Sequence, residues 1–170
     1  GIDKDFNAVE ACKFGLLLKL LEDENNDSIT HPALPNLDEN IHYGNSLVDS
    51  TKTNQSDIEY INPFDFGEEK FDVIVGNPPY MATEHIKRFT PLELPIYKEF
   101  FDSSYMQFDK YFLFIERGFN LLNSNGVLGY IIPSKFAKVG AGKKLRGLVS
   151  DKKAVEKIIS FGANQIFKDK

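Results

Sequence analysis

Hydrophobic and polar residues are grouped along this chain in blocks that predict helices and strands in alternation. A helix is predicted over residues 6–21, because the apolar residues there recur at helical spacing. Asp5 or Asn7 is the expected N-cap of this helix, and Glu10 could complete a capping box with Asn7. The chain therefore begins with a strand end followed at once by a helix.

Later blocks continue the same alternation. Short apolar runs predict one strand that ends at Asp3 and further strands over 40–43, 71–75, 127–132 and 155–161. Two further helices are predicted, one over 96–122 with a break near Asp109 and one over 141–149. The polar stretches 22–39 and 48–70 predict surface connections. This order is typical of an α/β domain with a mostly parallel sheet.

The stretch Phe71–Tyr80 contains the most informative motif of the chain. A strand that is predicted to be buried ends in a glycine and is followed by Asn77-Pro78-Pro79-Tyr80. Two successive prolines fix an extended backbone at the carboxyl end of the strand, where open α/β sheets bind ligands. The side-chain oxygen of Asn77 and the carbonyl of Pro78 could accept both hydrogens of an exocyclic amino group. Tyr80 offers a ring for stacking an extruded base. Asn-Pro-Pro also occurs in ordinary turns, but this order of features favours a catalytic site.

With this motif the chain resembles the amino-group methyltransferases that use S-adenosylmethionine. The segments Lys110–Gly118 and Asn125–Phe136 resemble the adenine-N6 DNA methyltransferase branch. Within it, the similarity is greatest to the large bifunctional (type IIG-like) restriction–modification and phage-defence enzymes. The resemblance implies a Rossmann-like fold with helices on both faces of the sheet. It also implies S-adenosylmethionine as cofactor and a flipped adenine in double-stranded DNA as substrate.

The resemblance also assigns the cofactor contacts. The Asp3 carboxylate, at a strand end, suits a ribose hydroxyl pair, although it could equally be a helix cap or a solvated strand end. Asn45 corresponds to a residue on the cofactor's adenine that is usually acidic in the family, and Leu47 would pack nearby. Phe114 corresponds to an aromatic on the adenine ring, with a core position as the alternative. Asn77 would adjoin the cofactor as well as the substrate.

One departure from the family pattern changes the expectation for the chain. The family places a glycine-rich turn after the first strand of its sheet, and no such turn precedes Asp3, while Gly140-Ala-Gly142 is a weak match at another position. The segment 161–167 resembles the approach to a further strand. We therefore expect a catalytic domain truncated at both ends, which alone binds S-adenosylmethionine weakly, transfers no methyl group and tends to self-associate through an unpaired edge.

Composition fits one soluble domain. The chain has 170 residues, of which 42% are hydrophobic and 26% charged. No apolar run approaches the roughly 20 residues that span a bilayer, so no membrane partner is expected. The single cysteine, Cys12, is compatible with a cytosolic protein and is expected to be a small core residue. His31, His42 and His85 lack metal-ligand spacing, so we predict no metal site.

Charge is distributed unevenly along the chain. Residues 1–130 contain 10 Lys and Arg against 22 Asp and Glu, a net charge of −12, whereas residues 131–170 contain 10 against 3, a net charge of +7. The basic part includes Lys135, Lys138, Lys143, Lys144 and Arg146. Such a cluster suits phosphate contacts, and a solvated helix face is an equal alternative.

Two alternatives to the DNA reading remain open. The same Asn-Pro-Pro-Tyr motif serves protein-glutamine methyltransferases and guanine-N2 methyltransferases acting on ribosomal RNA. The helical stretch 96–122, followed by the strand and Pro133-Ser134, favours the DNA branch. The chain could instead be a non-catalytic interaction module with a methyltransferase-like sheet, but the intact residues 77–80 argue against a decayed site.

Overall fold

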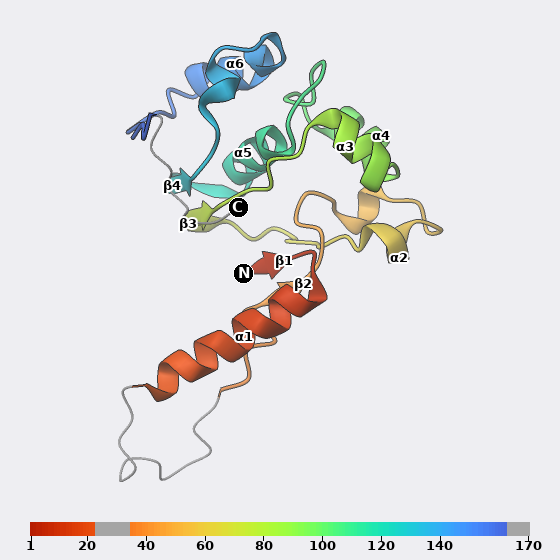
Figure 1. The fold of residues 1–170 in the computed structure, drawn as a ribbon, viewed down its shortest axis with the longest axis vertical. Coiled ribbons are helices and arrows are strands. Elements are labelled where there is room, and N and C mark those ends of the chain that lie inside the picture. The colour runs from red at the N-terminus through yellow and green to blue at the C-terminus, as the bar shows by residue number, and fades with distance from the viewer. Residues whose placement is uncertain (23–34, 163–170) are drawn as a thin grey trace.

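A computed structural model describes residues 1–22 and 35–162 of the chain. Figure 1 shows an alternation of short strands and helices. The strands are β1 (Ile2–Asp3), β2 (His42–Tyr43), β3 (Phe71–Gly76) and β4 (Leu122–Tyr130), and the α-helices are α1 (Phe6–Leu21), α2 (Ile58–Ile61), α3 (Thr83–Phe89), α4 (Glu93–Phe100), α5 (Lys110–Leu121) and α6 (Lys143–Asp151). Three short 3-10 helices are η1 (Ser50–Lys52), η2 (Ser134–Ala137) and η3 (Gly140–Gly142).

The strands form two separate parallel pairs. Strand β1 pairs with β2, and β3 pairs with β4 in a register that sets Gly76 opposite Tyr130. The mixed α/β architecture and the parallel pairing agree with the expected fold class. One continuous sheet is not formed, because within the described residues no backbone ladder joins β1 to β3. The expected Rossmann-like sheet with helices on both faces is thus present only as two small parts.

Strand β3 is much more exposed than its sequence suggests, so the expectation of a buried strand was wrong. Val73 and Val75 are 62% and 76% exposed. Helix α5 covers the β3–β4 pair closely, since a Cβ atom on Gly118 would lie 2.8 Å from a methyl group of Leu128. Val73 and Val75 are two positions apart and point to the same face of the strand. The described residues leave that face uncovered.

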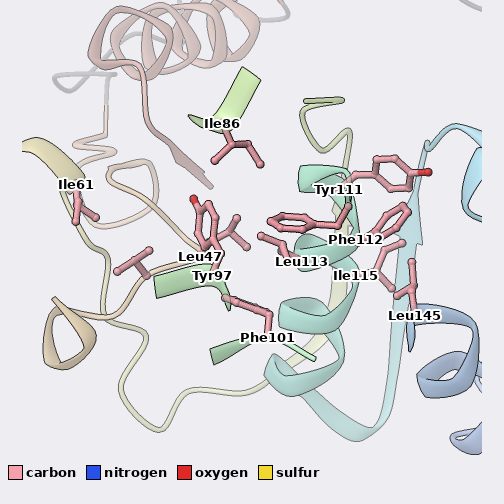
Figure 2. Close-up of a cluster of buried hydrophobic side chains, with 12 residues drawn as sticks. Leu47, Ile61, Ile86, Tyr97, Phe101, Tyr111, Phe112, Leu113, Ile115 and Leu145 are labelled. Atoms are coloured by element: carbon pink, nitrogen blue, oxygen red, sulfur yellow. The ribbon is translucent and has the colours of Figure 1, made fainter. Parts of the chain in front are cut away.

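The main core surrounds α5, as Figure 2 shows. Helices α3, α4 and α6 and the turn after β2 contribute to it. Its fully buried members include Leu47, Ile86, Tyr97, Phe108, Tyr111, Phe112, Leu113 and Leu145. The loop between α4 and α5 is fixed to this core by Glu116, which accepts hydrogen bonds from the backbone N–H groups of Asp102 (3.1 Å) and Ser103 (2.8 Å). The core also supports the Asn-Pro-Pro-Tyr motif after β3, because the ring of Tyr111 packs against that of Tyr80.

Several local predictions can be compared with this fold. The helix 6–21 is confirmed, and Asp5 is its cap, accepting hydrogen bonds from the backbone N–H groups of Asn7 and Ala8. The helical stretch after residue 96 is divided into α4 and α5, as the break near Asp109 predicted. Strand β4 begins at Leu122, earlier than expected.

Two further predictions were wrong. No strand forms over 155–161, where every side chain is exposed, because a strand needs a hydrogen-bonding neighbour and none of the described strands lies beside it. Cys12 lies on an exposed part of α1 and is not a core residue, because Val9 alone of the described residues of this helix is buried. Residues 163–167 of the expected approach to a further strand lie outside the described residues. Within 1–22 and 35–162, none of the helices has both the length and the apolar content needed to span a bilayer.

Candidate functional site

A cavity of about 1130 Å³ lies between the β1–β2 pair and strand β3. Asp3, Asn45, Asn77 and Phe114 all contribute to its lining. These residues come from four separate parts of the chain, namely the ends of β1, β2 and β3 and the middle of α5. The structure therefore brings together the residues at the ends of three strands, and the proposed substrate residue Asn77 shares one cavity with proposed cofactor contacts.

The loop after β3 is held in place by Tyr80. The side-chain oxygen of Asn77 lies 2.6 Å from the Tyr80 hydroxyl, and the carbonyl oxygen of Ile131 lies 2.9 Å from it, so this hydroxyl can donate to either acceptor. The Tyr80 ring packs edge-on against Tyr111, with centroids 6.1 Å apart, and remains 47% exposed. Pro78 is buried while Asn77 and Pro79 are exposed. Tyr80 thus stands beside the cavity as an accessible ring whose hydroxyl orients Asn77.

The expected cofactor contacts differ in their surroundings. One oxygen of Asp3 accepts a hydrogen bond from the backbone N–H of Asp5 at 2.7 Å, so Asp3 supports the turn into α1 as well as facing the cavity. Asn45 is 4% exposed, and its oxygen accepts from the N–H of Leu47 at 3.2 Å. Its amide nitrogen has no partner among the described residues. Phe114 is half-buried.

Leu47 requires a correction. It is fully buried in the core and is not part of the cavity lining. The hydrogen bond from its backbone to Asn45 turns the chain so that the Leu47 side chain packs into the core. Its direct role is therefore to fix the turn that presents Asn45.

Sequence analysis missed a buried charged cluster beneath the cavity. Glu93 is 2% exposed, and it accepts hydrogen bonds from Tyr97 at 2.7 Å, from Lys110 at 3.0 Å and from Lys4. Burial raises the pKa of Glu93, but Lys110 and Lys4 outweigh burial, so its pKa lies below the ordinary value. Lys4 and Lys110 line the cavity. A glutamate four residues before a tyrosine on one helix, the spacing of Glu93 and Tyr97, was the signal in the sequence.

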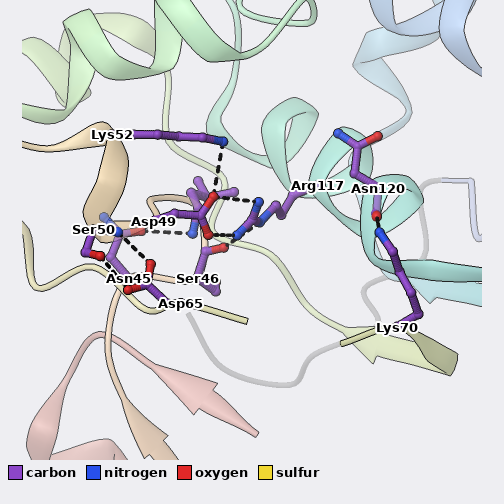
Figure 3. A network of polar contacts seen from close by, with 10 residues as sticks. Asn45, Ser46, Asp49, Ser50, Lys52, Asp65, Lys70, Arg117 and Asn120 are labelled. Carbon is purple, nitrogen blue, oxygen red and sulfur yellow. Dashed lines mark hydrogen bonds and ion pairs between the residues drawn. The ribbon is translucent and has the colours of Figure 1, made fainter. Parts of the chain in front are cut away.

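A second polar network ties the turn after β2 to α5, as Figure 3 shows. Arg117 donates to both carboxylate oxygens of Asp49 and, at 3.1 Å, to the carbonyl oxygen of Ser46. Burial raises the pKa of Asp49, but hydrogen bonds from Arg117 and Lys52 lower it below its ordinary range. Two-point binding of a carboxylate by arginine fixes orientation as well as distance. Both networks therefore join the β1–β2 part to the β3–β4 part.

The described residues contain no group of three His, Cys, Asp or Glu side chains arranged to hold a metal ion. The cavity is lined by amide, carboxylate, aromatic and ammonium groups, among them Asn45, Asp3, Phe114 and Lys110.

Residues 1–167 match the family model described as Eco57I restriction-modification methylase. The chain belongs to the Eco57I restriction-modification methylase family. It is 61% identical over 173 residues to the type II restriction enzyme and methyltransferase RM.Eco57I of Escherichia coli, across 100% of the chain and 17% of that protein.

Other type II methyltransferases are also similar to this chain. The chain is 34% identical to the putative type II restriction enzyme and methyltransferase RM.MjaORFECS2P of Methanocaldococcus jannaschii, over 84% of the chain and 13% of that protein. It is 34% identical to the type II methyltransferase M.BstVI of Geobacillus stearothermophilus, over 59% of the chain and 17% of that protein. The Eco57I-family chain thus spans less than a fifth of the length of these curated relatives.

Proposed function

We propose that this chain forms the central catalytic part of a site-specific DNA methyltransferase in a restriction–modification or phage-defence system. The enzyme transfers a methyl group from S-adenosylmethionine to the N6 atom of a flipped adenine. The observation that carries the proposal is the shared cavity, in which Asn77 lies with Asp3, Asn45 and Phe114. Membership of a restriction-modification methylase family favours DNA over a protein-glutamine or ribosomal RNA substrate.

The residues of the cavity fit a nucleoside cofactor. The Asp3 carboxylate would accept hydrogen bonds from the ribose hydroxyls, and the buried, unpartnered amide of Asn45 would meet the edge of the adenine ring. The half-buried ring of Phe114 would pack on a base face. When bound, S-adenosylmethionine supplies an electrophilic methyl group.

The residues of the motif would prepare the amino group for attack. The side-chain oxygen of Asn77 retains a lone pair beside the one facing Tyr80, and it would accept one amino hydrogen while the Pro78 carbonyl accepts the other. These two hydrogen bonds direct the nitrogen lone pair out of the ring plane. The Tyr80 ring would stack on the flipped base. No strong base is needed, because the proton leaves to solvent after nitrogen has formed its bond to carbon, so acceleration comes from positioning.

The test is methyl transfer to DNA by the full-length protein with labelled S-adenosylmethionine, followed by digestion to nucleosides. We expect the label in N6-methyladenine, and an Asn77→Ala variant should lose about 100-fold or more of the rate while remaining folded. Label in protein, in RNA or in another nucleoside would contradict the proposal. An Asn77→Ala variant with an unchanged rate would show that the methyl acceptor is held elsewhere.

A further inference from the structure

The part of the chain that follows β4 has the opposite charge to the rest of the described molecule. From residue 131 to residue 153 it contains seven Lys and Arg residues against one Asp, whereas residues 1–130 have a net charge of −12. This segment comprises η2, η3 and α6, which lie together beyond β4 in Figure 1, at the other end of the molecule from α1. The segment after β4 therefore differs strongly in net charge from the part of the chain that precedes it.

The basic segment is a well-packed unit. A Cβ atom on Gly142 would overlap the carbonyl oxygen of Phe136, so glycine is required for this close approach. Arg146 donates hydrogen bonds to the carbonyl oxygens of Phe136 (2.7 Å) and Val139 (2.8 Å), which close the segment on itself. Leu145 fixes α6 to the core with no exposed surface. Arg146 thus stabilises the fold of this segment, and the lysines lie on a well-packed backbone.

Four lysines form what we call the basic surface: Lys135, Lys138, Lys143 and Lys144, all of them exposed. Among the ion pairs of the described residues, this surface takes part in one, between Lys135 and Asp109 at 3.7 Å. Lys143 and Lys144 occupy the first turn of α6, which contains no acidic residue. A cation at this end of a helix is repelled by the positive end of the helix dipole. Folding alone does not account for their position.

The segment that carries the basic surface begins beside the loop of Tyr80, and Lys135 is the lysine linked to that loop. The Tyr80 hydroxyl lies within hydrogen-bonding distance of the Ile131 carbonyl at the start of the segment, and the Tyr111 hydroxyl donates to the Pro133 carbonyl at 3.2 Å. Asp109, which pairs with Lys135, also forms a backbone bridge with Ala82, two residues after Tyr80. A nucleic-acid strand that places one base on the Tyr80 ring must bring its phosphates close to this region.

We propose that the basic surface binds the DNA backbone beside the flipped nucleotide, through phosphate contacts that do not depend on sequence. This inference rests on the proposed function and extends it, because it identifies the side from which DNA approaches. Exposed lysines suit this task, since a flexible ammonium group acts as a point charge toward phosphate. The acidic surroundings of the rest of the chain would repel DNA from other directions.

The test compares two lysine pairs of equal charge in the full-length protein. Lys143→Gln with Lys144→Gln removes two charges from the basic surface, and Lys13→Gln with Lys19→Gln removes two charges from α1. Binding of fluorescent duplex DNA of mixed sequence is measured over a series of salt concentrations. The first variant should reduce the slope of log affinity against log salt by about 1.8, that is, roughly 0.9 for each lost phosphate contact. The α1 variant should retain the wild-type slope.

Two further measurements complete the test. One distinguishes the loss of charge from a loss of structure, and the other distinguishes a failure of this inference from a failure of the proposed function. Lys143→Arg with Lys144→Arg should restore the slope, and all variants should keep the wild-type KM for S-adenosylmethionine. If the wild-type protein methylates DNA and the glutamine variant keeps the wild-type slope, the basic surface is not the DNA contact while the proposed function stands. If the wild-type protein neither binds nor methylates DNA, the proposed function itself is wrong.

Discussion

Helices α1 and α5 are both rich in apolar residues, yet their surroundings are opposite. In α5, eight residues are buried, among them Tyr111, Phe112 and Leu113. In the described structure of α1, Val9 is the one buried residue, and Phe14 is 63% exposed. Helix α5 packs against the β3–β4 pair, α4 and α6, whereas α1 contacts the two-residue strands β1 and β2. Apolar content therefore does not determine burial here; the number of neighbouring elements does.

The same contrast divides the candidate site. We call β3, β4 and the loop of Asn77 the acceptor side, and β1, β2 and α1 the cofactor side. Helix α5, which carries the proposed cofactor contact Phe114, is assigned to neither side. The acceptor side is supported by the main core. The cofactor side is joined to the rest through the turn after β2, whose Leu47 enters the core, and through the ion pairs of Lys4 with Glu93 and of Asp49 with Arg117. The geometry of Asn77 should accordingly be robust, and that of Asp3 should depend on these contacts.

The largest effect is expected from breaking the contact between the two sides at Glu93. Glu93→Ala should reduce the free energy of unfolding by about 3–5 kcal/mol, because it leaves Lys110 buried without its counter-charge. Urea unfolding followed by circular dichroism measures this loss. The control is Glu93→Leu combined with Lys110→Met, which replaces the buried pair by apolar groups and should recover most of the stability. An Ala variant as stable as the wild type would show that the cluster does not join the two sides.

The next largest effects are expected in the kinetic constants, where substitutions on the two sides should change kcat and KM differently. Asn77→Ala should lower kcat by about 100-fold with little change in the KM for S-adenosylmethionine, because the proposed role of Asn77 is to position the methyl acceptor. Asp3→Ala should instead raise that KM by roughly 10-fold, the equivalent of about 1.4 kcal/mol of binding. Initial-rate measurements on the full-length protein give both constants. If the two variants changed the same constant, the division of the cavity into an acceptor side and a cofactor side would be wrong.

Features set by neighbouring residues could be predicted from the sequence. The extent of α1 and its Asp5 cap, the end of β3 at Gly76 and the position of Asn77 at a strand end all follow from residues within a few positions. Short apolar runs also placed Asp3 and Asn45 at or just after strand ends, while the family resemblance selected them as cofactor contacts. The structure brings both to the cavity of Asn77.

Features set by distant partners could not be predicted in this way. Val73 and Val75 have the composition of a buried strand, but their exposure depends on which elements cover the sheet. Leu47 enters the core because of a local turn that its sequence does not reveal. The role of Glu93 depends on Lys4 and Lys110, which lie 89 and 17 residues away in the chain.

A smaller effect is expected from Tyr80, whose ring and hydroxyl have separate tasks. Tyr80→Ala should weaken binding of DNA containing a flipped or mismatched target base by about 1–3 kcal/mol, the usual contribution of stacking on an aromatic ring. Tyr80→Phe keeps the ring and removes the hydroxyl beside Asn77 and Ile131, so binding should stay near the wild-type value while kcat falls by the equivalent of about 1 kcal/mol. Equal losses of binding in both variants would assign the interaction to the hydroxyl.

The smallest effect concerns the dependence of stability on pH. Lys110 and Lys4 hold the pKa of Glu93 below its ordinary value of 4.5 in spite of burial, so on acidification the unfolded chain takes up a proton at Glu93 before the folded protein does. The stabilisation by this carboxylate is therefore fully present above pH 4.5 and is lost as pH falls below that value through the folded pKa. Thermal unfolding from neutral to acid pH measures the change. Glu93→Gln should make the midpoint less sensitive to pH in this range, whereas Glu10→Gln, on exposed α1, should leave the profile unchanged. A Glu93→Gln profile parallel to that of the wild type would mean that other carboxylates control acid unfolding.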